Sequence, residues 1–265
     1  MILADFHVHS DNSPDGCNSV IELCESAVSK GISYLAVTDH CEIDAFYKDR
    51  FNIGYRQSYV EVKKAISAFS QQIQVLAGIE LGQATSDIAI AEDVTALPYD
   101  VILGSMHCMP GIGDFYYMDY KNMDVHKLFS DYFDELLRLV NWGGFDVLAH
   151  ITYPLRYING KHGYNLKTED FGEKIEKVLR EIIKRGIALE INTSGLRQPF
   201  NQIIPDSFCL SLYKSLGGEL LTIGSDSHRA VDIGSGIPQG IEFIKQAGFT
   251  KYCIYKKRMP VFIVI

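Results

Sequence analysis

The chain has 265 residues, of which 47% are hydrophobic, so it can bury a large core within one domain. It carries 25 basic and 33 acidic residues, and its one short basic run, KKR at 256–258, argues against a nucleic-acid-binding protein. No apolar run reaches the roughly 20 residues of a membrane span, MILADFH lacks a signal-peptide pattern, and six cysteines form no CxxC pair, so we expect a cytoplasmic protein with free thiols.

Short runs that are apolar at consecutive positions predict β-strands buried on both faces. Along the chain these runs are ILADF (2–6), SYLAVT (33–38), QVLAGI (74–79), VILGSM (101–106), FDVLA (145–149), IALEI (187–191), LLTIGS (220–225), YCIY (252–255) and VFIVI (261–265). The last two lie in the segment 229–265, which we interpret as closing strands or as an interface.

Amphipathic helices are predicted between most of these strands. Ser19 and Glu22 have the spacing of a capping box, with Gly31 as the stop, while apolar faces recur over 55–69, 128–140 and 175–183. The segment 84–96 has no clear pattern. Strand and helix alternate about seven times, which predicts parallel strands with right-handed crossovers. A β/α barrel fits best, and an open sheet stays an alternative that lacks its usual Gly-rich loop.

Potential metal ligands follow six of the first seven predicted strands. They are His7 and His9, Asp39 and His40, Glu80, His107, His150, and Asp226 with His228. The sixth strand ends at Asn192 and has no clear ligand. In a β/α barrel all these strand ends meet at one face, where the chemistry takes place. A single histidine is more often a local hydrogen-bonding group, as we expect for His126 and His162, but six of eight at strand ends indicate a metal site.

The number of ligands points to a multinuclear centre. Asp15 lies in a Pro-Asp-Gly turn that can bring its carboxylate over the barrel mouth, and Asp39 is expected to orient His40 or another ligand. The expected ligands are His7, His9, Asp15, His40, Glu80, His107, His150, Asp226 and His228. This set is too large for one ion and suits two or three divalent ions, with Zn, Fe or Mn favoured by the imidazole and carboxylate donors.

The order of these motifs resembles the PHP (polymerase and histidinol phosphatase) superfamily: HxH, SxDG, TDH, a Glu after the third strand, GSxH, a lone His and GSDSH. The resemblance implies a distorted (β/α)7 TIM-like barrel, with residues 1–265 as a single domain, and a trinuclear metal centre. By this pattern one metal is held by His7, His9, Glu80 and Asp226. Glu80 bridges to a second metal on His107 and His150, and a third lies on Asp15, His40 and His228.

Within that superfamily the chain most resembles the monofunctional histidinol-phosphate phosphatases, through LEINTSGLR at 189–197. This resemblance implies hydrolysis of L-histidinol phosphate in histidine biosynthesis. Arg156 and Arg197 follow neighbouring strand ends of an acidic protein, and we expect both to bind the phosphate because guanidinium groups bind it bidentately. Asp15 and His228 are the alternatives for the proton donor to the leaving group.

Other interpretations share some of these features. Related barrels hydrolyse protein phosphotyrosine or nucleotides, and a metal-stabilised barrel without catalysis is a further alternative. The loop 108–119 is a candidate lid in which Phe115, Tyr116 or Tyr117 stacks on the substrate imidazole and Asp114 or Asp119 meets its ammonium group. The loops with Phe46, Tyr47 and Tyr153 are equally plausible. The sequence leaves the oligomeric state open.

Overall fold

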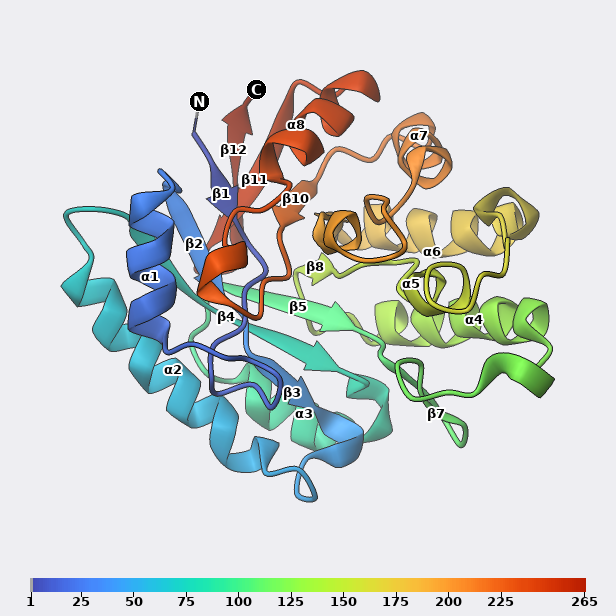
Figure 1. Cartoon of the computed structure of the whole chain (residues 1–265), viewed down its shortest axis with the longest axis horizontal. Coiled ribbons are helices and arrows are strands. Elements are labelled where there is room, and N and C mark those ends of the chain that lie inside the picture. Colours follow the sequence, from blue (N-terminus) through green and yellow to red (C-terminus); the bar gives the residue numbers. More distant parts are fainter. Residues whose placement is uncertain (1) are drawn as a thin grey trace.

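A nearly closed barrel of parallel strands forms the centre of the molecule (Figure 1). The computed structural model describes residues 2–265. Within them the barrel strands, in order around the sheet, are β1 (Ala4–Asp5), β2 (Tyr34–Val37), β4 (Gln74–Gly82), β5 (Val101–Ser105), β8 (Val147–Leu148), β9 (Ala188–Asn192) and β10 (Leu221–Gly224). All neighbouring pairs are parallel, and nearly every residue of these strands is buried. The seven predicted barrel strands are confirmed.

The first and last barrel strands lie against each other, which distinguishes a barrel from an open sheet. The amide of Phe6 donates to the carbonyl of Ile223 at 3.0 Å, and Val8 forms a parallel bridge with Ser227. The buried carboxylate of Asp5 accepts hydrogen bonds from the amide and hydroxyl of Ser225. The predicted β/α barrel is therefore confirmed, and all its strand C-termini point toward one mouth.

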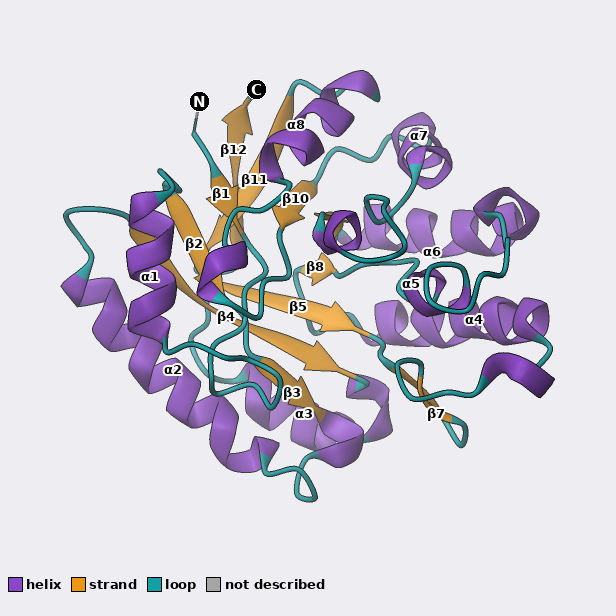
Figure 2. Ribbon diagram, viewed as in Figure 1, coloured by secondary structure: helices purple, strands orange, loops and turns teal. Residues whose placement is uncertain are grey.

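Helices surround the barrel (Figure 2). They are α1 (Val20–Ser29), α2 (Phe51–Ala68), α3 (Ile88–Thr95), α4 (Val125–Trp142), α5 (Leu155–Ile158), α6 (Gly172–Arg185), α7 (Ser207–Ser215) and α8 (Ile237–Gln246). The capping box predicted at Ser19 and Glu22 is present, and α6 ends at Gly186 with φ 69°. None of the helices between residues 2 and 265 is both long and apolar enough to span a membrane.

Three short strands were not predicted: β3 (His40–Glu42) at the barrel mouth, and β6 (Cys108–Met109) and β7 (Gly113–Asp114), which form a hairpin within the loop 108–119. Strand β3 pairs in parallel with the end of β4, placing His40 opposite Glu80 and Glu42 opposite Gly82. Three residues are too few to show a periodic pattern, so this strand follows from its pairing with β4 rather than from its own composition. It adds an acidic side chain, Glu42, to the barrel mouth.

The C-terminal segment differs in part from expectation. Strands β11 (Lys251–Lys256) and β12 (Met259–Val264) pair antiparallel with each other as a separate two-stranded sheet. The prediction that they close the barrel is wrong, because β1 and β10 meet directly. The hairpin packs beside β10 instead, where the Cys253 thiol lies 3.2 Å from the carbonyl of Leu221. The alternative of an interface stays a prediction.

Candidate metal centre

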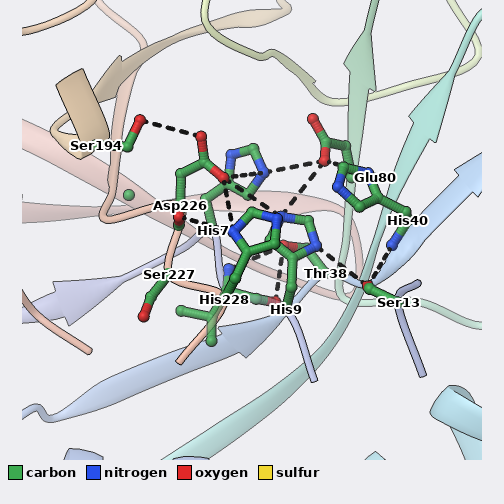
Figure 3. Close-up of polar contacts among 12 residues, drawn as sticks. His7, His9, Ser13, Thr38, His40, Glu80, Ser194, Asp226, Ser227 and His228 are labelled. Atoms are coloured by element: carbon green, nitrogen blue, oxygen red, sulfur yellow. Dashed lines mark hydrogen bonds and ion pairs between the residues drawn. The ribbon is translucent and has the colours of Figure 1, made fainter. Parts of the chain in front are cut away.

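The nine predicted ligands lie together at the barrel mouth and are called the metal centre below. Figure 3 shows the imidazole rings of His7, His9 and His228 gathered beside Asp226, with Glu80 and His40 next to them. These side chains come from segments far apart in the sequence, and they meet because parallel strands end on the same face. The sequence prediction that they form one cluster agrees with this arrangement, while the ion that each residue holds stays a prediction.

Glu80 lies at the middle of the metal centre and is fully buried. Its Oε1 is 2.8 Å from Nε2 of His150 and 3.2 Å from Nε2 of His107. Its Oε2 is 3.2 Å from Nε2 of His7 and 2.9 Å from Nδ1 of His40. A carboxylate with different imidazoles on each oxygen has the arrangement needed to bridge two ions.

Asp226 faces the same group from the end of β10. Its Oδ1 is 3.5 Å from Nε2 of His9, and its Oδ2 accepts a 2.9 Å hydrogen bond from Arg156. Asp226 has φ 52°, and His150 on the opposite side has φ 25°. Left-handed backbone at such residues costs about 1–3 kcal/mol and is typical of functional sites, where the surrounding fold holds it in place.

The outer part of the metal centre is formed by Asp15 and two imidazoles. The Oδ2 of Asp15 is 3.0 Å from Nε2 of His228, and its Oδ1 is 3.7 Å from Nε2 of His40. The Asp15 side chain is 59% exposed, so this part opens to solvent. The His9 ring stacks on both His40 and His228, with centroids 4.2 Å apart in each case. His9 therefore lies as close to the predicted third site as to the first.

The pKa values reflect an alternation of imidazoles and carboxylates. Burial opposes protonation of His7, but the carboxylates of Glu190 and Glu80 outweigh it and place its pKa well above the usual value. Burial raises the pKa of Glu80, but the imidazoles of His7 and His107 outweigh burial. The pKa of Glu80 therefore lies well below its usual value. Burial, with the neighbouring imidazoles, lowers the pKa of His9 to about 3. Positive charge is thus favoured on His7, next to two carboxylates, and disfavoured on His9, which lies between other imidazoles.

These residues fit divalent metal ions. The Nε2 atoms of His7 and His9 and the Oε2 of Glu80 are buried and have no hydrogen-bond partner among the described residues. Buried polar atoms without partners are costly, and a shared ion would satisfy them together. Four groups have ligand atoms within 4.8 Å of one another: His9/His40/His228, His7/Glu80/His150, His7/His9/Asp226 and His40/Glu42/His107. The last contains a residue that the sequence analysis missed.

Two acidic residues lie behind the ligands, and neither was predicted. Glu190 in β9 accepts from Nδ1 of His7 at 2.6 Å and from the amide of His150 at 2.8 Å. Glu42 in β3 lies 2.9 Å from Nδ1 of His107. The signal for Glu190 was a charged residue inside the apolar run IALEI, two positions before Asn192 and hence on the same face.

Asp39 was expected to orient His40 or another ligand, and in the structure its carboxylate contacts serine residues near those ligands. Its carboxylate accepts hydrogen bonds from the amide and hydroxyl of Ser10 and from the hydroxyls of Ser13 and Ser58. The Ser13 hydroxyl in turn lies 3.3 Å from Nδ1 of His9 and accepts from the amide of His40. Asp39 therefore holds the loop that carries the ligands and does not enter the ligand groups above.

The two candidate phosphate-binding arginines have different surroundings. Arg156 in α5 is buried beside the metal centre, where its Nη2 donates to Asp226 and to Ser194, while its Nε has no partner among the described residues. Arg197 donates from Nη2 to the main-chain carbonyls of Ser225 and Asp226 at 2.8 and 3.3 Å. The contacts of Arg197 are those of a group that supports the segment carrying Asp226.

The loop 108–119 is only partly suited to bind a substrate. Phe115 is fully buried, and Asp119 caps a short 3-10 helix through the amide of Lys121, so both have structural contacts. Asp114 is half-buried, and burial raises the pKa of its carboxyl group. The ring of Tyr153 lies 4.9 Å from those of His107 and His150, at the inner end of this region.

Comparison with known proteins agrees with this geometry. The chain matches the PHP domain family over residues 5–194. It is 26% identical over 270 residues to a probable histidinol-phosphatase from Thermotoga maritima, covering 97% of each chain, and 26% identical to a histidinol-phosphatase from Lactococcus lactis, covering 92% and 91%.

A solved structure shares the fold. The histidinol phosphate phosphatase of Lactococcus lactis, crystallised with zinc, L-histidinol and phosphate, superposes with a TM-score of 0.81 at 22% identity over 98% of each chain. The family match covers more than half of the sequence and includes His7, His9, Glu80, His107 and His150. The chain belongs to the PHP domain family.

Proposed function

We propose that this protein is a metal-dependent phosphomonoesterase that hydrolyses L-histidinol phosphate to L-histidinol and phosphate. The observation that carries the proposal is the bridging position of Glu80 among imidazoles, with the Arg156 guanidinium held against the adjacent Asp226. Relatives with the names given above, matched over nearly their full length, support the choice of substrate.

We propose that two or three divalent ions, of zinc, iron or manganese, are held by His7, His9, Asp15, His40, Glu80, His107, His150, Asp226 and His228. Such ions lower the pKa of a bound water and neutralise charge on phosphoryl oxygens. Imidazole nitrogens and carboxylate oxygens together favour these metals over calcium and magnesium.

The protein's own groups bind and orient the ester. Arg156 is buried and still has a free Nε, so it can donate to a phosphoryl oxygen while Nη2 stays on Asp226. Such donors, placed in advance where charge develops, stabilise the transition state. Arg197 holds the carbonyls of Ser225 and Asp226 and thereby keeps Asp226 in its left-handed conformation.

A proton must reach the leaving alkoxide, and two groups stand at the open rim. Asp15 and His228 are 3.0 Å apart and both are partly exposed. Burial raises the pKa of Asp15, but the imidazoles of His228 and His40 outweigh it and hold that pKa well below its usual range, so Asp15 must first receive a proton before it can donate one. We retain both as candidates. Variants Asp15→Asn and His228→Gln, compared on an ester with an acidic leaving group that needs no proton, identify the donor as the residue whose loss is rescued.

We further propose that residues 1–265 act as one domain in a reducing, cytoplasmic setting. The described helices and strands surround a single core cluster, and all six cysteines are unpaired. Free thiols are typical of reducing compartments.

The deciding experiment measures phosphate release from L-histidinol phosphate by protein loaded with zinc, manganese or iron. Phosphotyrosine and a nucleotide monophosphate are assayed in parallel, and a chelator is the control. We expect strong preference for L-histidinol phosphate that disappears with the chelator. Chelator-sensitive activity on another ester would overturn the substrate and keep the metal centre, and inactivity with metal bound would refute the enzymatic function.

A further inference from the structure

Glu42 is an acidic residue at the barrel mouth with no role in the function proposed above. It is the last residue of β3, and because strand side chains alternate it shares a face with His40. Its side chain is only 15% exposed. The neighbours of its two carboxylate oxygens differ, and this difference indicates what Glu42 does.

The oxygen Oε1 faces two ligand imidazoles. It is hydrogen-bonded to Nδ1 of His107 at 2.9 Å and lies 3.2 Å from Nδ1 of His40, which is closer to Oε2 of Glu80, at 2.9 Å. The opposite nitrogen of His107, Nε2, faces Glu80 at 3.2 Å. Glu42 therefore lies behind the His107 ring, whose Nε2 points into the metal centre, and it shares the surroundings of His40 Nδ1 with Glu80.

The oxygen Oε2 is bound by Gln83 and lies next to Gly82. Gln83 donates from Nε2 to this oxygen at 2.7 Å, and its own Oε1 accepts from the amide of His107 at 2.9 Å. Gln83 has left-handed backbone with φ 50°. A Cβ atom at Gly82 would lie 1.9 Å from Oε2 of Glu42, so a larger residue at position 82 would displace the Glu42 carboxylate from this place. Gly82 and Gln83 together allow the carboxylate its observed position.

We propose that Glu42 is a positioning residue that accepts the Nδ1–H of His107 and so presents Nε2 of this ring to a metal ion, while the same oxygen lies next to Nδ1 of His40. It links the predicted His107/His150 site to the predicted Asp15/His40/His228 site. An acceptor behind a ligating imidazole sets its tautomer and raises its basicity, and removal of such a group typically weakens metal binding about 10–100-fold. The proposal rests on the metal centre of the proposed function.

The test is Glu42→Gln, which keeps shape and removes charge. The new amide can offer its oxygen to the imidazoles only by turning its NH2 toward the NH2 of Gln83. Gln83 cannot flip without losing its bond to the amide of His107. The matched control is Asp44→Asn, because Asp44 also accepts from Gln83 Nε2, at 3.1 Å, and forms no ion pair with a ligand imidazole within the described residues.

Metal content and affinity are measured by elemental analysis and chelator competition, without substrate. We expect Glu42→Gln to lose zinc from the site of His107 about 10–100-fold more readily than wild type, while the ion at His7/His9/Asp226 stays. Asp44→Asn should retain wild-type metal content. In 15N spectra of zinc-loaded wild type, the Nδ1–H signal of His107 should be present, and it should shift in Glu42→Gln.

Several outcomes would overturn the proposal. They are unchanged metal affinity in Glu42→Gln, equal loss in Asp44→Asn, or an ion found between Glu42 and the two Nδ1 atoms, which would make Glu42 a direct ligand. If Glu42→Gln does not fold, Glu42→Asp decides, since withdrawing the carboxylate should still weaken the site of His107. If the wild-type protein binds metal but does not hydrolyse L-histidinol phosphate, the proposed substrate is refuted and the proposed role of Glu42 is not.

Discussion

Arg156 and Arg197 follow adjacent strands, yet their guanidinium groups contact different parts of Asp226. Arg156 donates to the carboxylate of Asp226, and Arg197 donates to its main-chain carbonyl. Both residues are arginines, and both lie beyond the end of a barrel strand. The two arginines therefore differ in what their side chains contact, although phosphate binding was predicted for both.

We expect Arg156→Ala to lower kcat/KM about 100-fold or more, because a buried donor beside the reacting group is removed. Arg197→Ala should lower kcat/KM about tenfold or less and reduce the free energy of unfolding by about 1 kcal/mol, because it loses hydrogen bonds to Ser225 and Asp226. Steady-state kinetics and denaturant unfolding check both. A larger kinetic loss in Arg197→Ala, with unchanged stability, would restore Arg197 as a phosphate ligand.

Protonation of single ligands predicts how metal affinity depends on pH. Burial opposes protonation of His107, but Glu42 and Glu80 outweigh it and raise its pKa to about 10 in the metal-free protein. At pH 7 His107 thus carries a proton that an incoming ion must displace, whereas His9 is neutral. Metal affinity should therefore rise with pH between 6 and 8, about tenfold per unit for each proton displaced.

Calorimetric titration of zinc in two buffers with different ionisation enthalpies measures the protons released. We expect protons to be released into the buffer whenever a zinc ion binds to His107. An affinity that stays constant from pH 6 to pH 8, with no buffer dependence of the heat, would contradict the protonated state of this imidazole.

At the scale of elements, the turn of the C-terminal hairpin is held by tertiary contacts. Lys257 and Arg258 both have left-handed backbone, with φ 50° and 65°, as a two-residue turn of type I′ requires. Such turns favour Asn-Gly, so the local sequence opposes this conformation. The amide of Lys257 donates to the carboxylate of Asp100, and Nε of Arg258 lies 3.1 Å from both oxygens of Asp146.

Arg258→Ala should reduce the free energy of unfolding by about 1–2 kcal/mol, because it leaves the largely buried Asp146 without its cation. The magnitude stays at the lower end because Arg258 is 38% exposed. Lys257→Asn is the matched control, since it keeps the amide bond to Asp100 and should be neutral or stabilising by up to about 1 kcal/mol. Denaturant unfolding decides, and equal destabilisation by both variants would contradict the role of the ion pair.

Strand β3 shows why some elements escape prediction from sequence. Its three residues begin at the last residue of the VTDH motif, and they pair in register with Glu80, Leu81 and Gly82 of β4. The longer strands and the amphipathic helices were predicted, because their apolar patterns report burial directly. A short strand whose stability comes from a neighbour has no such pattern of its own.

For the whole molecule, metal binding and stability should be coupled. The metal centre places charged and polar groups in a buried space, and an ion that binds only the folded chain stabilises it by about 2.7 kcal/mol at a hundredfold excess over Kd. Removal of metal by a chelator should lower Tm by about 5–10 °C. Calorimetry with and without chelator checks this, with His107→Ala as a variant that should show a smaller difference. An unchanged Tm would mean that the ions contribute little to the folded state.

The sequence by itself determined the barrel class and most strands and helices, and it predicted nine candidate ligands that the structure places at one mouth of the barrel. It could do so because burial imposes apolar runs and because parallel strands bring their ends to one face, whatever the details of packing. Each of these inferences needs only the type of residue and its place along one element.

The tertiary structure alone decided which residues stand behind the ligands. Glu190 meets His7 across 183 positions of the sequence, Glu42 reaches His107 through an unpredicted strand, and Arg197 turns toward a backbone carbonyl. Such contacts depend on the register between distant strands and on the direction of each side chain. Neither leaves a local pattern, because the energy of these contacts arises only when the barrel has closed.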